Sequence, residues 1–131
     1  MIKKRAFLFF LVMVVLLIVA GCSGGEPQTY TNPATTISVK TNNEFIIALE
    51  ANATTGFAWE AAFDETMLQL VSQDYVPDEH EEGMVGVGGT DYFRLKALQT
   101  GSTTIELTYK QPWEEGEGEF DEHLTFTVEI N

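Results

Sequence analysis

Apolar and polar residues alternate along most of the chain from residue 37 onward. A period of two residues places the apolar side chains on one face of an extended strand, where they can be buried while the polar ones face water. No stretch shows the 3.6-residue period of an amphipathic helix. The alternation predicts seven strands, at residues 37–39, 45–49, 57–63, 68–76, 93–97, 105–109 and 124–130.

Seven short strands in roughly one hundred residues are typical of an all-β, immunoglobulin-like seven-stranded antiparallel β-sandwich. The chain has a single cysteine, so the Cys–Trp–Cys pattern of antibody domains is absent and only the architecture is implied. Three intervals fall outside the strands, at residues 51–56, 77–90 and 111–119. In such a sandwich these connections lie at the same end, and loops clustered on a rigid scaffold commonly carry recognition.

The start of the chain has the pattern of an exported protein. Three cations at residues 3–5 precede an uncharged run at residues 6–20, which is short for a membrane-spanning helix of about 20 residues. The run ends in Val19-Ala20-Gly21-Cys22. This ending resembles a bacterial lipobox, in which the cysteine thiol receives a diacylglyceryl group. We therefore expect residues 1–21 to be a lipoprotein signal peptide, with a plain signal peptide or an uncleaved anchor helix as the alternatives.

A lipidated Cys22 would anchor the exported protein to the cell membrane. Residues 22–34 combine glycine and proline with small polar residues, a composition that predicts a flexible tether. Residues 35–131 are expected to form the single folded domain.

Acidic residues dominate the charge of the protein. The net charge is −13, and removal of the three cations at residues 3–5 with a signal peptide makes it −16. Such a surface repels nucleic-acid phosphates and anionic lipid headgroups. We therefore expect no nucleic-acid partner, and membrane attachment through the lipid alone.

Residues suited to catalysis or metal binding are sparse. The only histidines are His80 and His123, no Gly-x-Ser-x-Gly motif is present, and a lipidated Cys22 cannot act as a nucleophile. The carboxylates at residues 78–82 and 114–119 lack EF-hand spacing and paired histidine or cysteine ligands. We expect no enzyme, no metal and no cofactor, and interpret both segments as solvated acidic loops.

Each of the three intervals contains a short motif. Residues 52–56 read Asn-Ala-Thr-Thr-Gly, which predicts a tight turn. Residues 86–89 read Gly-Val-Gly-Gly, which leaves backbone groups uncovered for pairing with another chain. Residues 111–113 read Gln-Pro-Trp, which places a tryptophan on a stiffened loop. Each motif also has a purely structural interpretation. These are, in the same order, a plain turn, a flexible hairpin connection and a tryptophan folded back onto the sandwich.

Together the motifs resemble those of the chagasin family of cysteine-protease inhibitors, which carries Asn-Pro-Thr-Thr-Gly, Gly-x-Gly-Gly and Arg-Pro-Trp in this order. The likeness covers residues 37–130. It implies a reversible, tight-binding inhibitor of papain-like cysteine proteases that blocks the active-site cleft with three loops, and we expect it to be a monomer. The alternative is a cell-surface adhesion or ligand-binding β-sandwich module without protease inhibition, because a fold alone does not define a function.

The resemblance also implies roles for individual residues. The first loop would enter the cleft, with Thr54 and Thr55 beside the catalytic Cys–His pair of the protease. Residues 86–89 would run along the non-primed side through backbone hydrogen bonds, and Trp113 would pack on the primed side. The implied protease-binding residues are Asn52, Thr54, Thr55, Gly56, Gly86, Gly88, Gly89, Gln111, Pro112 and Trp113.

Two residues depart from the family pattern. Ala53 replaces a proline, which should loosen the first loop and raise the cost of ordering it on binding. Gln111 replaces an arginine and removes a fork-shaped cation that could hold the loops or meet the enzyme. Both changes are expected to alter the affinity more than the binding mode.

Overall fold

A computed structural model describes residues 25–131, whose regular secondary structure consists of β-strands and one 3₁₀ turn. The strands are β1 (Gln28–Tyr30), β2 (Ile37–Val39), β3 (Glu44–Ala51), β4 (Ala58–Phe63), β5 (Leu68–Pro77), β6 (Gly89–Ala97), β7 (Gly101–Lys110) and β8 (Glu122–Ile130). One 3₁₀ turn, η1 (Ala53–Thr55), lies between β3 and β4. Within the described range no helix is long and apolar enough to cross a membrane. Cys22 and the predicted signal peptide lie outside the described residues.

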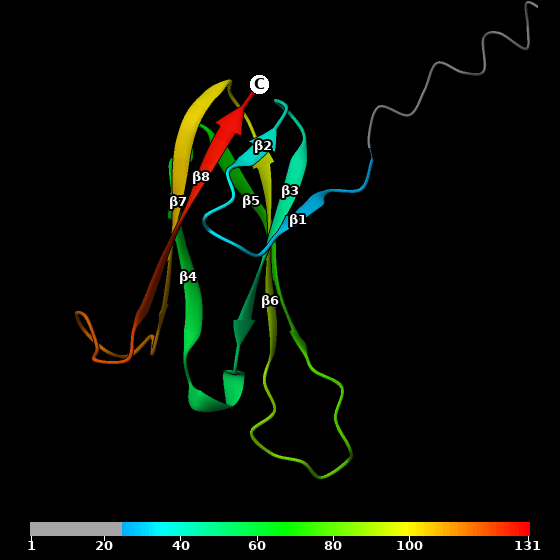
Figure 1. The fold of residues 1–131 in the computed structure, drawn as a ribbon. Helices are drawn as coiled ribbons and strands as arrows, with labels where there is room; N and C mark the ends of the chain where they lie inside the picture. The colour runs from blue at the N-terminus through cyan, green and yellow to red at the C-terminus, as the bar shows by residue number, and fades with distance from the viewer. Residues whose placement is uncertain (1–24) are drawn as a thin grey trace, which may run out of the picture.

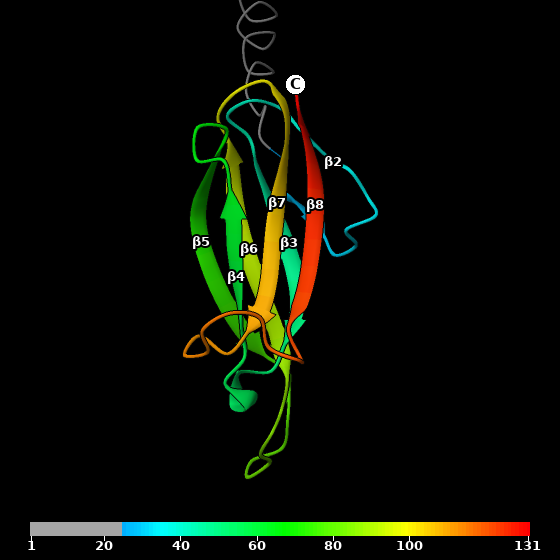
Figure 2. The ribbon, with the colours of Figure 1, turned by 90° about the vertical axis from the view of Figure 1, so that its left-hand side faces the viewer.

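The strands form two four-stranded sheets that face each other as a sandwich (Figure 1 and Figure 2). One sheet has the order β1-β3-β6-β5, and the other has the order β2-β8-β7-β4. The predicted immunoglobulin-like sandwich is confirmed, with eight strands instead of seven. The pairs β1–β3 and β2–β8 are parallel, so each sheet is mixed at one edge instead of wholly antiparallel.

The additional strand, β1, lies in the stretch that the sequence predicts as a flexible tether. Tyr30 pairs with Ile47, its side chain is buried in the core, and its hydroxyl donates a hydrogen bond to the Ser38 carbonyl at 3.4 Å. Within the predicted tether over residues 22–34, Gln28–Tyr30 therefore form a strand of the sandwich. Only Tyr30 of the three residues in β1 is buried, so this strand shows no alternating pattern.

The core consists of the apolar residues that the alternation places on one face of each strand. Pairing brings these side chains level across a sheet, as with Phe45 beside Leu95 and Ile47 beside Phe93. The largest fully buried side chains are those of Phe45, Phe93, Phe126, Ile37, Ile47, Leu68, Leu95, Ile105, Leu107 and Val128. Because the described residues contain no cysteine, their stability depends chiefly on apolar burial, which contributes about 25 cal/mol per Å².

The strand register brings the three strand-free intervals to one end of the sandwich. Ala51 and Pro77 both pair with Gly89, so the connections that follow β3 and β5 start side by side. In the other sheet Ala58 pairs with Lys110, the last residue of β7. Figure 1 shows the three connections, coloured green, yellow-green and orange, at the end away from the C-terminus.

Candidate functional site

Three loops form the candidate site: the β3–β4 loop (residues 52–57), the β5–β6 loop (residues 78–88) and the β7–β8 loop (residues 111–121). Hydrogen bonds join them to one another. Asn52 Nδ2 donates to the carbonyl of Gly86 at 3.2 Å, and Gln111 Nε2 donates to the carbonyl of Thr55 at 3.3 Å. The three sequence motifs therefore come together in one surface.

Polar groups of the β3–β4 loop form hydrogen bonds with one another. Asn52 is extended (φ −133°), and its Oδ1 accepts hydrogen bonds from Thr54 N at 3.1 Å and Thr54 Oγ1 at 2.6 Å. Thr55 Oγ1 donates to the carbonyl of Asn52 at 2.7 Å. Gly56 ends the turn at φ +79°, a conformation that glycine adopts without strain from a Cβ atom. The tight turn is confirmed, and it leaves Thr54 and Thr55 exposed at its tip.

Tyr109 supports this loop through a hydrogen bond and through the packing of its ring. Its hydroxyl accepts a hydrogen bond from the N–H of Asn52 at 2.8 Å. Its ring packs between Phe57 and Trp59, with ring centroids 5.3 Å and 4.9 Å away, and Trp59 Nε1 donates to the carbonyl of Glu50 at 2.9 Å. The sequence assigns Tyr109 only to the inner face of its strand, so its contact with Asn52 is a site feature that the sequence reasoning missed.

The β5–β6 loop is closed at its base and tied to the β3–β4 loop near its middle. Asp78 N donates to the carbonyl of Gly88 at 2.9 Å. Gly83 and Gly86 have φ of +89° and +73°, so the segment between them turns sharply. The bond from Asn52 to Gly86 then fixes one side of this turn.

Two adjacent glycines of the second motif have different surroundings. A Cβ added at Gly88 would meet nothing nearer than the carbonyl oxygen of Ala51 at 3.4 Å. A Cβ added at Gly89 would collide with the carbonyl oxygen of Val76 and lie 2.8 Å from Pro77 Cα. Gly89 is buried and is required where β6 packs against β5, whereas Gly88 has room on its open side.

The β7–β8 loop places Trp113 on the outside of the site. The side chain is 68% exposed, and its ring lies over Gly56, where an added Cβ would collide with Cη2. Pro112 precedes it and is exposed. Trp113 therefore rests against the β3–β4 loop while most of its surface faces solvent.

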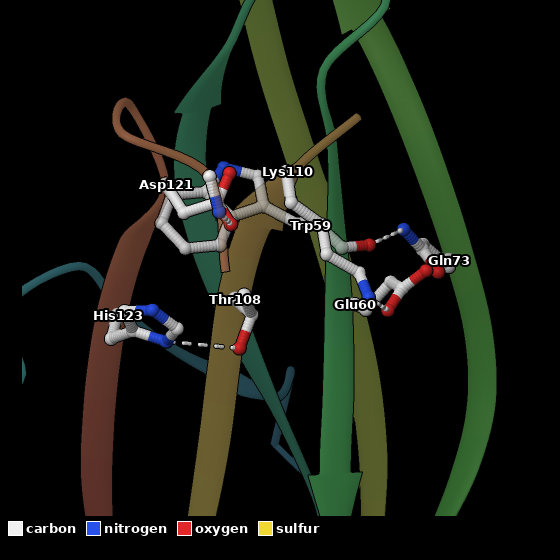
Figure 3. Close-up of polar contacts among 8 residues, drawn as sticks. Trp59, Glu60, Gln73, Thr108, Lys110, Asp121 and His123 are labelled. Atoms are coloured by element: carbon white, nitrogen blue, oxygen red, sulfur yellow. Dashed lines mark hydrogen bonds and ion pairs between the residues drawn. The ribbon is translucent and has the colours of Figure 1, made fainter. Parts of the chain in front are cut away.

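Polar contacts link β4, β7 and β8 beside the loops, as Figure 3 shows. Lys110 Nζ lies 3.3 Å from Glu60 Oε2, across the strand pair β4–β7. Lys110 thus contacts a neighbouring strand and does not replace the cation that Gln111 lacks. Thr108 Oγ1 and His123 Nδ1 lie 3.3 Å apart on β7 and β8.

Asp91 is a buried carboxylate that the sequence reasoning missed. It is 6% exposed, and its Oδ2 accepts a hydrogen bond from Gln73 Nε2 at 3.0 Å. Gln73 also donates to the carbonyl of Trp59 at 3.2 Å and so links the two sheets (Figure 3). Asp91 Oδ1 has no hydrogen-bond partner within residues 25–131. The sequence does contain a signal for this burial: Asp91 occupies an inward-facing position in the alternating pattern that continues through Phe93.

Burial raises the pKa of Asp91 above its ordinary value of 3.8, and the hydrogen bond from Gln73 opposes this rise only in part. The folded state therefore binds more protons than the unfolded state between the ordinary and the raised pKa, so stability falls as pH rises through that window. We expect Asp91→Asn to raise the free energy of unfolding at neutral pH by about 1 kcal/mol and to remove this pH dependence. Urea unfolding of both proteins across that window measures it, and an unchanged pH dependence in the variant would contradict the assignment.

Ala53 occupies a position that a proline can take without strain. It is the first residue of η1, where the N–H of a helical turn is unpaired, and the preceding Asn52 has the extended backbone that proline requires. It also lines two surface hollows of about 290 and 420 Å³, which leave space for a ring.

We therefore expect Ala53→Pro to stabilise the fold by about 0.4–1 kcal/mol by reducing the freedom of the unfolded chain. For the inhibitory role that the resemblance implies, we also expect it to lower the inhibition constant for papain several-fold, because the loop is ordered before binding. Thermal unfolding and inhibition assays measure the two effects. An unchanged inhibition constant in a stabilised variant would show that a loose loop does not limit affinity.

The acidic loops show no metal centre. Within residues 25–131, no group of three or more histidine, cysteine, aspartate or glutamate side chains is placed to hold a metal ion. The polar groups at the loop end are instead used to fix loop conformation, as in Asn52 and Gln111. The arrangement suits recognition of another macromolecule.

Known proteins share this sequence pattern and this fold. The sequence profile of the chagasin family peptidase inhibitor I42 matches residues 38–130. Amoebiasin-1 of Entamoeba histolytica is 33% identical over 103 residues, which cover 79% of this chain and 95% of that protein. Chagasin of Trypanosoma cruzi is 28% identical over 109 residues, which cover 79% of this chain and 96% of that protein.

A solved structure extends the comparison to three dimensions. The crystal structure of the cysteine protease inhibitor EhICP2 from Entamoeba histolytica matches with a TM-score of 0.65 at 28% identity, over 82% of this chain and 100% of that chain. The profile match spans all three loops and most of both sheets. The chain therefore belongs to the chagasin family of peptidase inhibitors.

Proposed function

We propose that the protein is a reversible inhibitor of papain-like cysteine proteases whose three loops fill the active-site cleft together. The observation that carries this proposal is the joint anchoring of the loops. Asn52 is bonded to Gly86 and Tyr109, and Gln111 is bonded to Thr55. Loops that are already fixed lose little conformational freedom on binding, so more of the contact energy appears as affinity.

The carbonyl groups of the β3–β4 loop explain why a protease would not cleave it. Hydrolysis needs an aligned carbonyl about 3–3.5 Å from the attacking sulfur. The carbonyl of Asn52 accepts hydrogen bonds from Thr55, that of Ala53 from Gly56, and that of Thr55 from Gln111. Turning any of these towards the nucleophile would break an internal bond. These three carbonyls are therefore held back from attack, and we assign the protein the role of an inhibitor with no catalytic step of its own.

Each of the three loops offers exposed groups for a different part of the enzyme cleft. Thr54 and Thr55 stand at the tip of the turn and would lie beside the catalytic pair of the enzyme. The carbonyls of Gly86 and Gly88 already accept hydrogen bonds from Asn52 and Asp78, so the N–H groups of residues 86–88 and the carbonyl of Val87 are what this loop would offer for pairing along one side of the cleft. Trp113 offers a largely exposed ring on the other side, and tryptophan is among the side chains that most often dominate binding energy.

Titration of papain with the chain from Ser23 onward, which keeps all eight strands, tests the proposal. We expect competitive, reversible inhibition, and recovery of an intact inhibitor from the complex. Full enzyme activity in a large excess of the protein would contradict the proposal and favour the adhesion or ligand-binding alternative. Cleavage of the chain within residues 52–57 would contradict the protection of the loop carbonyls.

We also propose that Cys22 carries a lipid and anchors the exported protein. The lipobox-like residues 19–22 and the uncharged run before them support this. Labelling of expressing bacterial cells with a fatty acid tests it, with Cys22→Ser as the control. We expect label on the natural chain alone, and equal labelling of both chains would contradict it.

A further inference from the structure

The most exposed large apolar side chains lie on the loops that flank the β3–β4 loop. Among the described residues, Met84, Val85, Trp113 and Phe120 are 56%, 93%, 68% and 75% exposed, more than any other large apolar side chain. Phe120 belongs to none of the three sequence motifs. An exposed aromatic side chain at a recognition surface is a candidate anchor for a partner.

The turn that carries Phe120 is fixed by its own hydrogen bonds. Gly118 N donates to Asp121 Oδ2 at 2.7 Å, and Asp121 N donates to the carbonyl of Gly118 at 3.3 Å. A Cβ at Gly118 would lie 2.8 Å from Glu114 Oε2 and 3.0 Å from Asp121 Oδ1, so the loop is folded tightly on itself. The exposure of Phe120 is therefore a consequence of the folded conformation of this turn.

The β7–β8 loop leans out to the side of β7 and β8. In Figure 1 it lies to the left of the β3–β4 loop, and Figure 2 shows it as a separate orange arch across the end of its sheet. A partner held by the β3–β4 loop would therefore meet this loop beside the inserted turn. The contact would fall on the enzyme surface next to the cleft.

The charge around Phe120 indicates the kind of surface that it fits. Residues 114–122 contain carboxylates at every position except Gly116, Gly118 and Phe120, and residues 111–122 contain no lysine or arginine. An apolar ring within a negative rim is complementary to an apolar depression with basic side chains around it. Charges at the rim of an interface act mainly on the association rate and on partner choice.

We propose that Phe120 is a second anchor of the inhibitor, which packs into an apolar depression with a basic rim on the protease surface outside the catalytic cleft. This inference rests on the proposed function, and it makes the β7–β8 loop the element that selects among related proteases. Trp113 acts at the cleft itself, whereas Phe120 acts on a neighbouring surface that varies from one enzyme to another.

Inhibition constants of Phe120→Ala for papain and several papain-like enzymes of different surface charge test the proposal. Val71→Ala is the matched control, because Val71 is also exposed, at 44%, but lies within β5. We expect Phe120→Ala to raise the inhibition constant about tenfold for enzymes with basic surfaces and less for acidic ones. Val71→Ala should leave all of them unchanged. Replacing Glu117 and Glu119 with glutamine should slow association with the basic enzymes at low salt.

The outcomes separate this inference from the function on which it rests. If Phe120→Ala inhibits every enzyme as well as the natural chain does, Phe120 is no anchor, while the proposed function stands. If the loss is the same for basic and acidic enzymes, selection by the loop is refuted. If size-exclusion chromatography shows a dimer that Phe120→Ala abolishes, the ring serves contact between copies and the inference fails. If the natural chain inhibits no enzyme, both proposals fail.

Discussion

Replacing Trp113 with alanine is expected to raise the inhibition constant for papain by about two orders of magnitude. Trp113 is 68% exposed and contacts the site over Gly56, so the substitution removes a large anchor from the surface and little from the core. The free energy of unfolding should therefore change by less than about 0.5 kcal/mol, as for an ordinary surface substitution. Inhibition assays and urea unfolding measure the two quantities.

A conservative variant sharpens this result. Trp113→Phe keeps an aromatic ring and should fall between the natural chain and Trp113→Ala in its inhibition constant. Faster dissociation should account for most of the loss, because changes at one interface act mainly on the dissociation rate. Equal inhibition by all three proteins would refute the role of Trp113 as the anchor of the β7–β8 loop.

Introducing glutamate at Gly88 should weaken inhibition by at least a factor of about one hundred, because a bulky charge would separate the loop backbone from the enzyme and be desolvated there. The fold has room for the new side chain, since the nearest atom to an added Cβ is the carbonyl oxygen of Ala51 at 3.4 Å. The inhibition constant and the unfolding temperature together distinguish lost binding from lost folding.

Three matched variants separate the causes of this loss. Gly88→Gln adds the same bulk without the charge, and Gly88→Ala adds only a methyl group. Gly25→Glu adds the same charge before β1, where nothing lies within 4 Å of an added Cβ. We expect a graded loss at Gly88 and none at Gly25. A Gly88→Glu protein that inhibits normally would show that this backbone does not face the enzyme.

The sequence predicts most of the fold because the alternation extends through long strands such as β6 and β8, although β5 buries only Leu68 fully. Residues such as Phe93 and Leu95 repeat every second position, and their burial follows directly from that pattern. The common end of the three loops follows from the order of the strands in an immunoglobulin-like sandwich. β1 could not be predicted in this way, because it contributes one buried ring, Tyr30, and so has no repeated apolar position.

The internal supports of the site could not be read from the sequence. The bond between Asn52 and Tyr109 joins residues 57 positions apart, and only the register of the sheets brings them together. The same holds for Trp113 over Gly56. The buried position of Gly89, predicted as a protease contact, also depends on how closely β5 and β6 approach.

The position of β1 bears on how an anchored inhibitor would be presented. Gln28 pairs with Phe45 near the start of β3, whereas the β3–β4 loop follows the end of β3. With Cys22 lipidated, residues 23–27 would span at most about 18 Å between the bilayer and the fold. The start of β3 would then lie near the bilayer, and with the strands along the membrane normal the loops would lie about 30 Å further out for strands of ten residues. In that orientation the three loops would face soluble enzymes that approach the cell.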